Sequence, residues 1–288
     1  MKYAMKIFQR PYGLATSTWN KKVVSRVRAE YELMKDYRSE YVIEYYDFLE
    51  NVTWQKANGE RVQDVCALVL EYVDGTDLYD FVNSKSVILA EDGLRCMFQK
   101  VVRGIIEFHD RGILHGDIKL ENIMISKDFK IRFIDFNRSV RLDTTHTQVI
   151  GTPGHIAPDT PYHAAPEADV FAFGVSLYRA CTKSMPSITR STDTALSFSI
   201  ENDTNLSDEN MSFNLKDLIR LTVVSADQRI SMPHVVKHPW LAEDRKDCEQ
   251  KVMDEAFKYI RIVKKSKRVT ADHIDDTINL FTARENYV

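Results

Sequence analysis

The sequence predicts an α+β protein, in which a small β-sheet with one helix precedes a larger, mainly helical part. Two observations carry this prediction. Strand-like segments predominate up to residue 73, whereas apolar residues recur at helical spacing from Asp77 onward. The chain has 288 residues, of which 44% are hydrophobic, and this is enough for one large domain or for two lobes.

The first part contains three predicted strands and one predicted helix. Apolar side chains lie on both faces of a strand over residues 3–8. Residues 20–36 carry Val23, Val27, Tyr31 and Met34 at helical spacing among charges, which indicates an amphipathic helix. Residues 41–52 and 64–73 have the composition of paired strands, joined through a polar loop whose Asn58-Gly59 is a strong turn signal.

The second part contains four predicted helical segments: 92–112, 168–182, 214–224 and 231–241. Gly112 is typical of the residue that ends a helix, and the segment 168–182 is apolar nearly all round, so it predicts a buried helix. The polar residues 187–214 predict a loop with short helical pieces, and the HPW sequence at 238–240 predicts the end of the last helix.

The C-terminal tail beyond Ala242 has two apolar stripes. The first comprises Val252, Ala256, Ile260 and Val263, and the second comprises Ile274, Ile278 and Phe281. Thr270 is expected to cap the second helix. Both stripes are expected to pack on the body of the protein, and docking of a partner through the tail is the alternative.

Composition excludes several classes of protein. A net charge of -3 argues against a nucleic-acid binder, and the longest apolar runs fall far short of the roughly 20 residues that span a membrane. The first ten residues lack the apolar core of a signal peptide. Four cysteines stand singly, without the spacing of a metal site or a disulfide frame. We therefore expect a cytoplasmic protein, with a nuclear location left open, and no nucleic-acid or membrane partner.

The chemistry is concentrated in two short segments, HGDIKLEN at residues 115–122 and IDFN at residues 134–137. Phosphoryl transfer requires charge neutralisation and alignment more than covalent help from the protein. A metal-binding carboxylate, a second metal ligand, a cation for the phosphates and a carboxylate near the attacking hydroxyl meet those needs. The sequence contains residues of all four types, in a recognisable order along the chain.

These segments, with others, resemble the eukaryotic protein kinase family over nearly the whole chain, and the resemblance implies a two-lobed kinase fold that uses ATP and Mg²⁺. In HGDIKLEN it implies Asp117 as catalytic base, Lys119 as a contact to the transferred phosphate and Asn122 as a metal ligand. In IDFN it implies Asp135 as the main magnesium ligand.

The segments of the first part resemble the nucleotide-binding strand, helix and hinge of the same family. YAMKIF implies that Lys6 contacts the ATP phosphates, and RAEYELMKDY implies that Glu30 pairs with it. VLEYVDGTDL resembles the hinge. It implies Leu70 as the gatekeeper residue and Asp77 as an acid at the ribose end of the nucleotide. It also implies that backbone groups of Glu71 and Val73 form hydrogen bonds with adenine.

Three downstream segments extend the resemblance. GTPGHIAPD is similar to the GTPxYxAPE segment, and EADVFAFGV to the helix whose leading acid, here Asp169, braces the catalytic loop. SADQRISMPHVVKHPWL implies an ion pair between Arg229 and Asp159, which stands one methylene shorter than the family's glutamate. Lys119 with Thr152 resembles the serine/threonine branch, of the calcium/calmodulin-kinase-like or cyclic-nucleotide-kinase-like sort.

Three departures from the family pattern bear on activity. Gly116 replaces the arginine that meets a phosphate on the activation loop, so we expect that activity does not need phosphorylation of Thr144, Thr145 or Thr147. Asn137 replaces a glycine, and asparagine tolerates the positive φ of that turn. A glycine-rich hairpin before Lys6 is missing, which predicts a truncated N-terminal lobe: either the sequence starts late relative to the natural protein, or this is an atypical or inactive member of the family.

The predicted organisation is an N-terminal lobe over 1–73, a C-terminal lobe over 74–241 and a helical tail over 242–288. The predicted function is a serine/threonine protein kinase. By resemblance, acids at Asp77 and Glu121 can receive arginine, so protein substrates are expected to carry basic residues before the target. Two alternatives stay open: a pseudokinase that regulates a partner, and a small-molecule phosphotransferase. The second stays open because the catalytic loops of aminoglycoside and choline kinase relatives also contain the sequence HGD, followed by an asparagine and then by ID.

Overall fold

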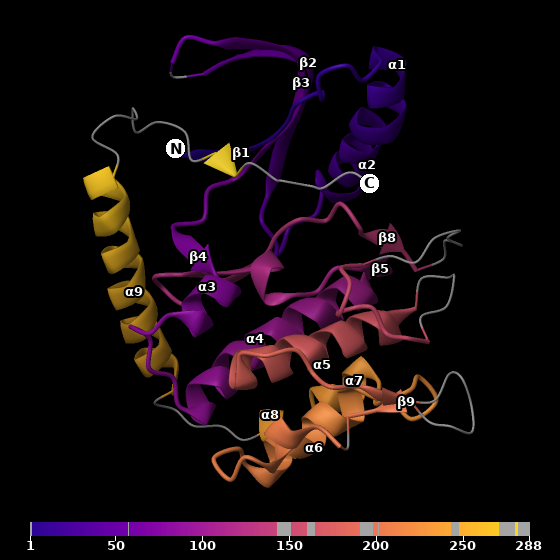
Figure 1. The fold of residues 1–288 in the computed structure, drawn as a ribbon, viewed down its shortest axis with the longest axis vertical. Coiled ribbons are helices and arrows are strands. Elements are labelled where there is room, and N and C mark those ends of the chain that lie inside the picture. Colours follow the sequence, from indigo (N-terminus) through magenta and orange to yellow (C-terminus); the bar gives the residue numbers. More distant parts are fainter. Residues whose placement is uncertain are drawn as a thin grey trace. The chain divides into compact units, whose positions relative to one another are not determined.

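The computed structural model describes residues 2–56, 58–142, 151–159, 165–190, 198–200, 202–242, 248–270 and 280–281. The chain divides into two compact units, one formed by Met1–Asp74 with Arg261–Val288 and the other by Gly75–Ile260. The first unit combines a four-stranded sheet with helical segments, and helices predominate in the described part of the second (Figure 1), which confirms the α+β class.

The first unit contains a sheet in the strand order β11-β1-β3-β2. Its strands are β1 (Tyr3–Phe8), β2 (Tyr45–Gln55), β3 (Arg61–Glu71) and β11 (Leu280–Phe281). β3 pairs antiparallel with β2, as predicted. It also pairs antiparallel with β1, a pairing that was not predicted, and this places Leu68 opposite Lys6. Gly59 has φ +85° in the connection between β2 and β3, in keeping with the predicted turn. The parallel pairing of β11 with β1 was not predicted.

The predicted helix of the first unit begins earlier and is less regular than its pattern indicated. It consists of α1 (Thr16–Trp19), a π-helical turn (Asn20–Val24) and α2 (Ser25–Met34). Val23, Val27 and Met34 of the predicted stripe are buried. The apolar face is therefore correct, and only the bounds and the local winding differ.

The second unit places the segments 115–122 and 134–137 next to short strands. After β4 (Gly75–Asp77) and α3 (Leu78–Asn83) the chain forms α4 (Glu91–Asp110), β5 (Ile113–Leu114), a 3₁₀ turn (Leu120–Asn122), β6 (Ile123–Ser126), β7 (Ile131–Phe133) and β8 (Val140–Arg141). β6 lies between β4 and β7, and β5 pairs with β8. Residues 115–122 therefore connect β5 to β6, and residues 134–137 directly follow β7.

Two long helices, α4 and α5 (Pro166–Thr182), form the centre of the second unit (Figure 1). The predicted apolar face of α4 is buried, and its Phe98 packs edge-on against Phe173 of α5 at 5.7 Å between ring centroids. Gly112 has φ +69° just beyond α4, as expected for the residue that ends a helix. α5 is buried nearly all round, so both helix predictions are confirmed.

A glycine of α5 allows a close approach by α6 (Phe213–Thr222). A Cβ atom added at Gly174 would lie 2.3 Å from Thr222 Oγ1, well inside van der Waals contact. The two helices therefore pack at a separation that only glycine permits at this position.

The prediction for the HPW sequence was wrong. The last predicted helix stops after α7 (Met232–Val235), and HPW leads into a second short helix, α8 (Pro239–Ala242). Proline is favoured in the first turn of a helix, because its missing N–H has no intrahelical partner there. Trp240 is fully buried, and its Nε1 donates to Glu91 at 2.8 Å.

The polar segment 187–214 also differs from its prediction of loop with short helical pieces. Its described residues include two short paired strands, β9 (Thr189–Arg190) and β10 (Phe198–Ser199), besides one 3₁₀ turn (Thr204–Ser207).

The first apolar stripe of the tail packs on the body of the protein, as predicted. It lies on α9 (Cys248–Thr270), where Val252, Ala256 and Ile260 are buried. Tyr259 stacks edge-on against Phe81 of α3 at 5.8 Å between ring centroids. No described helix has the length and apolar character of a membrane span.

The second stripe departs from its prediction where it is described. Thr270 is the last residue of α9 and not the cap of a new helix, and Phe281 lies in strand β11. Ile274 and Ile278 lie outside the described residues.

Candidate active site

The loop of residues 115–122 is held by the carboxylate of Asp169. Both oxygens accept backbone hydrogen bonds of 2.9 Å, one from the N–H of His115 and one from that of Gly116. Asp169 lies in the first turn of α5, where the positive end of the helix dipole favours a negative charge. His109 Nε2 is 3.0 Å from the same carboxylate. The predicted brace is therefore present.

Gly116 has a backbone conformation that suits glycine. Its φ is +76°, in the left-handed region that other residues enter at a cost of roughly 1–2 kcal/mol. The glycine that replaces the family's arginine thus also removes backbone strain next to Asp117.

Asp117 is the centre of a buried polar cluster. Thr152 Oγ1 donates to Asp117 Oδ1 at 2.6 Å, and Lys119 Nζ donates to Thr152 Oγ1 at 2.8 Å. Lys119 Nζ also lies 3.0 Å from Asp117 Oδ2. The amide of Asn122 donates to the backbone oxygen and to Oδ2 of Asp117 at 2.9 and 3.0 Å. The three predicted catalytic-loop residues are therefore brought together, with Thr152 as a fourth member.

The protonation state of Asp117 follows from these contacts. Burial alone would raise the pKa of Asp117, but the hydrogen bonds from Thr152 and Lys119 and the charge of Lys119 outweigh burial and lower it below its ordinary value. The carboxylate is therefore ionised at neutral pH and able to accept a hydrogen bond from a hydroxyl group.

Asp135 directly follows β7 and itself occupies the left-handed region, with φ +64°. Asn137 has no positive φ, so the reason given above for tolerating asparagine at this position was wrong. Aspartate is among the residues that enter this region most readily, and the positive φ lies at Asp135, two residues before Asn137. Phe136 is buried and packs against His115 and Phe108, at 4.7 and 5.6 Å between ring centroids.

In the first unit, Lys6 of β1 and Glu30 of α2 form the predicted pair. Lys6 Nζ lies 3.7 Å from Glu30 Oε2, and the two side chains are 9% and 1% exposed. The hydroxyl of Tyr45 donates to Glu30 Oε1 at 2.7 Å. The ammonium group is therefore held by a carboxylate that is itself fixed in place.

The remaining predicted nucleotide-binding residues lie around the end of β3 and the start of α3. Leu70 is buried on β3, and the backbone N–H of Glu71 donates to Glu44 at 2.9 Å. Val73 follows β3 in the first unit and is partly exposed. In the second unit, Asp77 caps α3 by accepting from the N–H of Asp80 at 2.8 Å, and burial raises its pKa.

The predicted ion pair between Arg229 and Asp159 is also present. Arg229 Nη2 lies 3.0 Å from Asp159 Oδ1, and the side chains are 2% and 8% exposed. The guanidinium group also donates to the backbone oxygens of Val224 and Glu167. It therefore ties together segments that are more than 50 residues apart in sequence.

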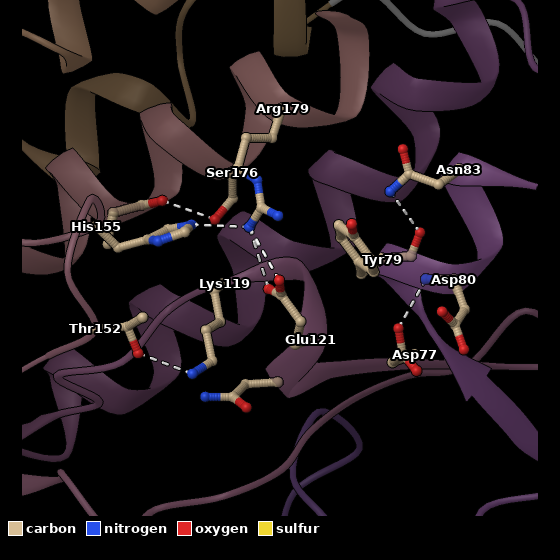
Figure 2. Close-up of polar contacts among 12 residues, drawn as sticks. Asp77, Tyr79, Asp80, Asn83, Lys119, Glu121, Thr152, His155, Ser176 and Arg179 are labelled. Atoms are coloured by element: carbon tan, nitrogen blue, oxygen red, sulfur yellow. Dashed lines mark hydrogen bonds and ion pairs between the residues drawn. The ribbon is translucent and has the colours of Figure 1, made fainter. Parts of the chain in front are cut away.

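A cavity of about 640 Å³ borders the catalytic loop. Its polar wall includes Lys119, Glu121, His155 and Arg179, and Met185 and Ile188 are apolar lining residues. Figure 2 shows Arg179 extending from α5 towards Glu121, with His155 beside it. Neither Arg179 nor His155 was predicted. The available signal was that Arg179 is the one charged residue of α5 after Asp169.

Comparison with known proteins matches residues 1–241 to the protein kinase domain. Serine/threonine-protein kinase PLK4 of Drosophila virilis is 25% identical over 84% of this chain, and the match covers 31% of that relative. Serine/threonine-protein kinase cds1 of Schizosaccharomyces pombe is 27% identical over 83% of this chain, and the match covers 52% of that relative. The chain thus spans less than a third of that PLK4 and about half of cds1.

Proposed function

This chain belongs to the protein kinase family, and we propose that it is an active serine/threonine kinase that transfers the γ-phosphate of ATP to hydroxyl groups of protein substrates. The observation that carries the proposal is the cluster of Asp117, Thr152 and Lys119. It combines an ionised carboxylate, able to accept a hydrogen bond from the attacking hydroxyl, with an adjacent cation.

The proposed catalytic roles follow from this geometry. Asp117 orients the substrate hydroxyl and accepts its hydrogen bond, and Lys119 neutralises charge that develops on the transferred group. Lys6, held by Glu30, contacts the ATP phosphates. Leu70, Glu71, Val73 and Asp77 are proposed to line the nucleotide site.

Asn122 and Asp135 fit the proposed role of magnesium ligands. Because both N–H bonds of the Asn122 amide are directed to Asp117, its side-chain oxygen is left as an acceptor. Mg²⁺ prefers oxygen ligands and is commonly held by one or two carboxylates together with substrate phosphates. When bound, the ion would supply charge neutralisation for the transferred phosphate.

We further propose the lobes 1–73 and 74–241 and the tail 242–288 as functional divisions, and a cytoplasmic or nuclear location. The four cysteines are free thiols, which suits a reducing compartment. We also propose that activity does not depend on phosphorylation of the activation loop. The reason is that Gly116 has no positively charged side chain to bind a phosphate there. Thr144, Thr145 and Thr147 lie outside the described residues.

The preference for basic residues before the target stays a prediction. It rests on Asp77 and Glu121, and both carboxylates have partners within the chain, the N–H of Asp80 and Arg179 respectively. An incoming arginine would have to compete with them.

The alternatives have less support. A pseudokinase has no chemical need for the Lys6–Glu30 pair together with an ionised Asp117. Binding to a partner through the tail is less favoured, because Val252, Ala256 and Ile260 of the first stripe are already buried within the second unit. The downstream Arg229–Asp159 pair, which the sequence places in the protein kinase pattern, argues against a small-molecule phosphotransferase.

Titration with Mg-ATP, followed by thermal unfolding, tests the nucleotide site. We expect a magnesium-dependent rise in Tm of several degrees at about 100 Kd of nucleotide, since such binding stabilises by about 2.7 kcal/mol. Asp135→Asn should abolish the rise, and Asp128→Asn, in an exposed turn, should keep it. No shift in the wild-type protein, or an equal shift in Asp135→Asn, would contradict the proposal.

A further inference from the structure

The cavity near Asp117 is lined by Arg179, which forms an ion pair with Glu121 and so neutralises its charge. Arg179 lies in the last turn of α5, and its Nη1 donates to both carboxylate oxygens of Glu121 at 3.1 and 3.3 Å (Figure 2). Its guanidinium group also lies over the ring of Tyr79, 5.0 Å from the centroid. The arginine is 15% exposed and Glu121 is 39% exposed, so the pair forms one wall of the cavity.

The contacts of Arg179 leave part of its hydrogen-bonding capacity unused. Both bonds to Glu121 and the 3.4 Å contact with His155 Nε2 involve Nη1. Among the described residues, Nη2 and Nε of Arg179 have no hydrogen-bond partner. A guanidinium group with free N–H donors is suited to a carboxylate or phosphate.

His155 supports this arrangement without adding charge. Burial, and then the charge of Arg179, lower the pKa of His155 to about 4, so the ring is neutral at physiological pH. Arginine can only donate, so Nε2 of His155 accepts and the ring proton lies on Nδ1. The ring therefore helps to orient Arg179 and does not repel it.

These charges discriminate between substrate side chains. A substrate arginine that entered the cavity would be repelled by the positive charges of Arg179 and Lys119. The carboxylate that would bind it, that of Glu121, is already paired with Arg179. A carboxylate would meet the unused donors of Arg179. The pair with Glu121 is partly exposed, so it can rearrange at small cost.

We propose that Arg179 determines substrate specificity: the cavity selects protein substrates with an acidic or phosphorylated side chain near the target Ser or Thr, and rejects arginine there. This inference rests on the proposed kinase function and names its substrate class. The proposed preference for acidic residues is the opposite of the predicted preference for basic residues, so a single series of peptides distinguishes the two.

The experiment compares kcat/KM for peptides that carry Arg, Gln, Glu or phosphoserine at one position at a time, within four residues of the target Ser. For the wild type we expect the Glu or phosphoserine peptide to exceed the Arg peptide by about tenfold at one position or more, which corresponds to about 1.4 kcal/mol. Comparison of the Glu and phosphoserine peptides shows which of the two anions fits better.

Arg179→Gln should remove or reverse this preference, because it removes the positively charged guanidinium group and frees Glu121 for an incoming cation. Glu121→Gln is a second variant, at a partly exposed position, and should strengthen the acidic preference. Arg103→Gln, at an exposed position of α4, is the matched control and should behave as the wild type.

A wild-type preference for the Arg peptide would overturn the inference, and so would an Arg179→Gln protein with the wild-type ratio. The neutral Gln peptide monitors the proposed function by itself. If the wild type phosphorylates no Gln, Glu or Arg peptide, the kinase proposal fails and the specificity inference fails with it. If the Gln peptide is phosphorylated but the ratios are flat, only the specificity inference fails.

Discussion

Thr152 connects the two charged groups of the catalytic loop, since its hydroxyl donates to Asp117 and accepts from Lys119. Thr152→Ala removes one of the hydrogen bonds that lower the pKa of Asp117. We predict that kcat/KM falls about tenfold, and that the acid limb of its pH profile moves to higher pH because Asp117 must be ionised. Thr152→Ser keeps the hydroxyl and should keep the profile. An unshifted limb in Thr152→Ala would contradict this role.

Gly116 allows a prediction about the backbone. Because its φ is +76°, Gly116→Ala should lower the free energy of unfolding by roughly 1–2 kcal/mol. Gly116→Asn should lower it by less, since asparagine enters the left-handed region more readily. Urea denaturation measures both. Equal losses for the two variants would argue against backbone strain as the cause.

His155 makes stability dependent on pH. Its pKa is lowered to about 4 in the folded chain from an ordinary value of 6.5. Between these values the unfolded chain binds a proton that the folded chain does not, so stability falls as the pH falls from 6.5 to 4. At about 1.4 kcal/mol per pKa unit the full loss is about 3 kcal/mol.

The test compares His155→Gln with the wild type by urea denaturation from pH 7 to pH 4. The buried His115 also has a lowered pKa and contributes in the same direction, so the informative quantity is the difference between the two proteins. That difference should change over this range. A constant difference would show that His155 does not titrate as described.

At the residue scale, the sequence predicted the motif residues well, because each stands in a short contiguous pattern. Asp117, Lys119 and Asn122 lie together as expected, and so do Lys6 and Glu30. Arg179 and His155 were missed because α5 and the segment containing His155 are distant from Glu121 in sequence. The left-handed turn at Asp135 was assigned to Asn137, since sequence pattern does not determine which residue of a turn takes positive φ.

At the scale of elements, the contact between α5 and α6 gives a further prediction. Gly174→Ala would place a methyl group 2.3 Å from Thr222 Oγ1. Both helices lie in the core, so they would have to move apart, and we predict a loss of about 1–3 kcal/mol in the free energy of unfolding. Thermal unfolding measures this loss. A Tm equal to that of the wild type would show that the helices separate without cost.

The helices and strands were predicted correctly where one buried apolar face determines the structure. They were predicted wrongly where local backbone geometry determines it. α4, α5 and the first half of the tail were predicted because their buried stripes are long and regular. The HPW sequence was misassigned because proline both ends helices and begins them. The pairing of Phe281 in β11 depends on a partner strand nearly the whole chain away, so its local pattern carried no such information.

At the scale of the whole molecule, each of the two units by itself contains a preformed group of predicted site residues. The first contains the ion pair of Lys6 and Glu30, and the second contains the cluster around Asp117 and the cavity lined by Arg179. The order of motifs along the chain predicted the α+β class and the family. The substrate class depends on side chains that meet only in the folded protein, and for that reason the sequence-derived and structure-derived expectations differ.

The most direct test of the kinase proposal is transfer of labelled phosphate from Mg-ATP to a degenerate peptide library with a fixed Ser or Thr, by the wild type and by Asp117→Asn. We predict magnesium-dependent labelling by the wild type and at least about a hundredfold less by Asp117→Asn, since the variant cannot accept the hydroxyl proton. Labelling that is equal in both proteins, or absent from the wild type, would contradict the proposed function.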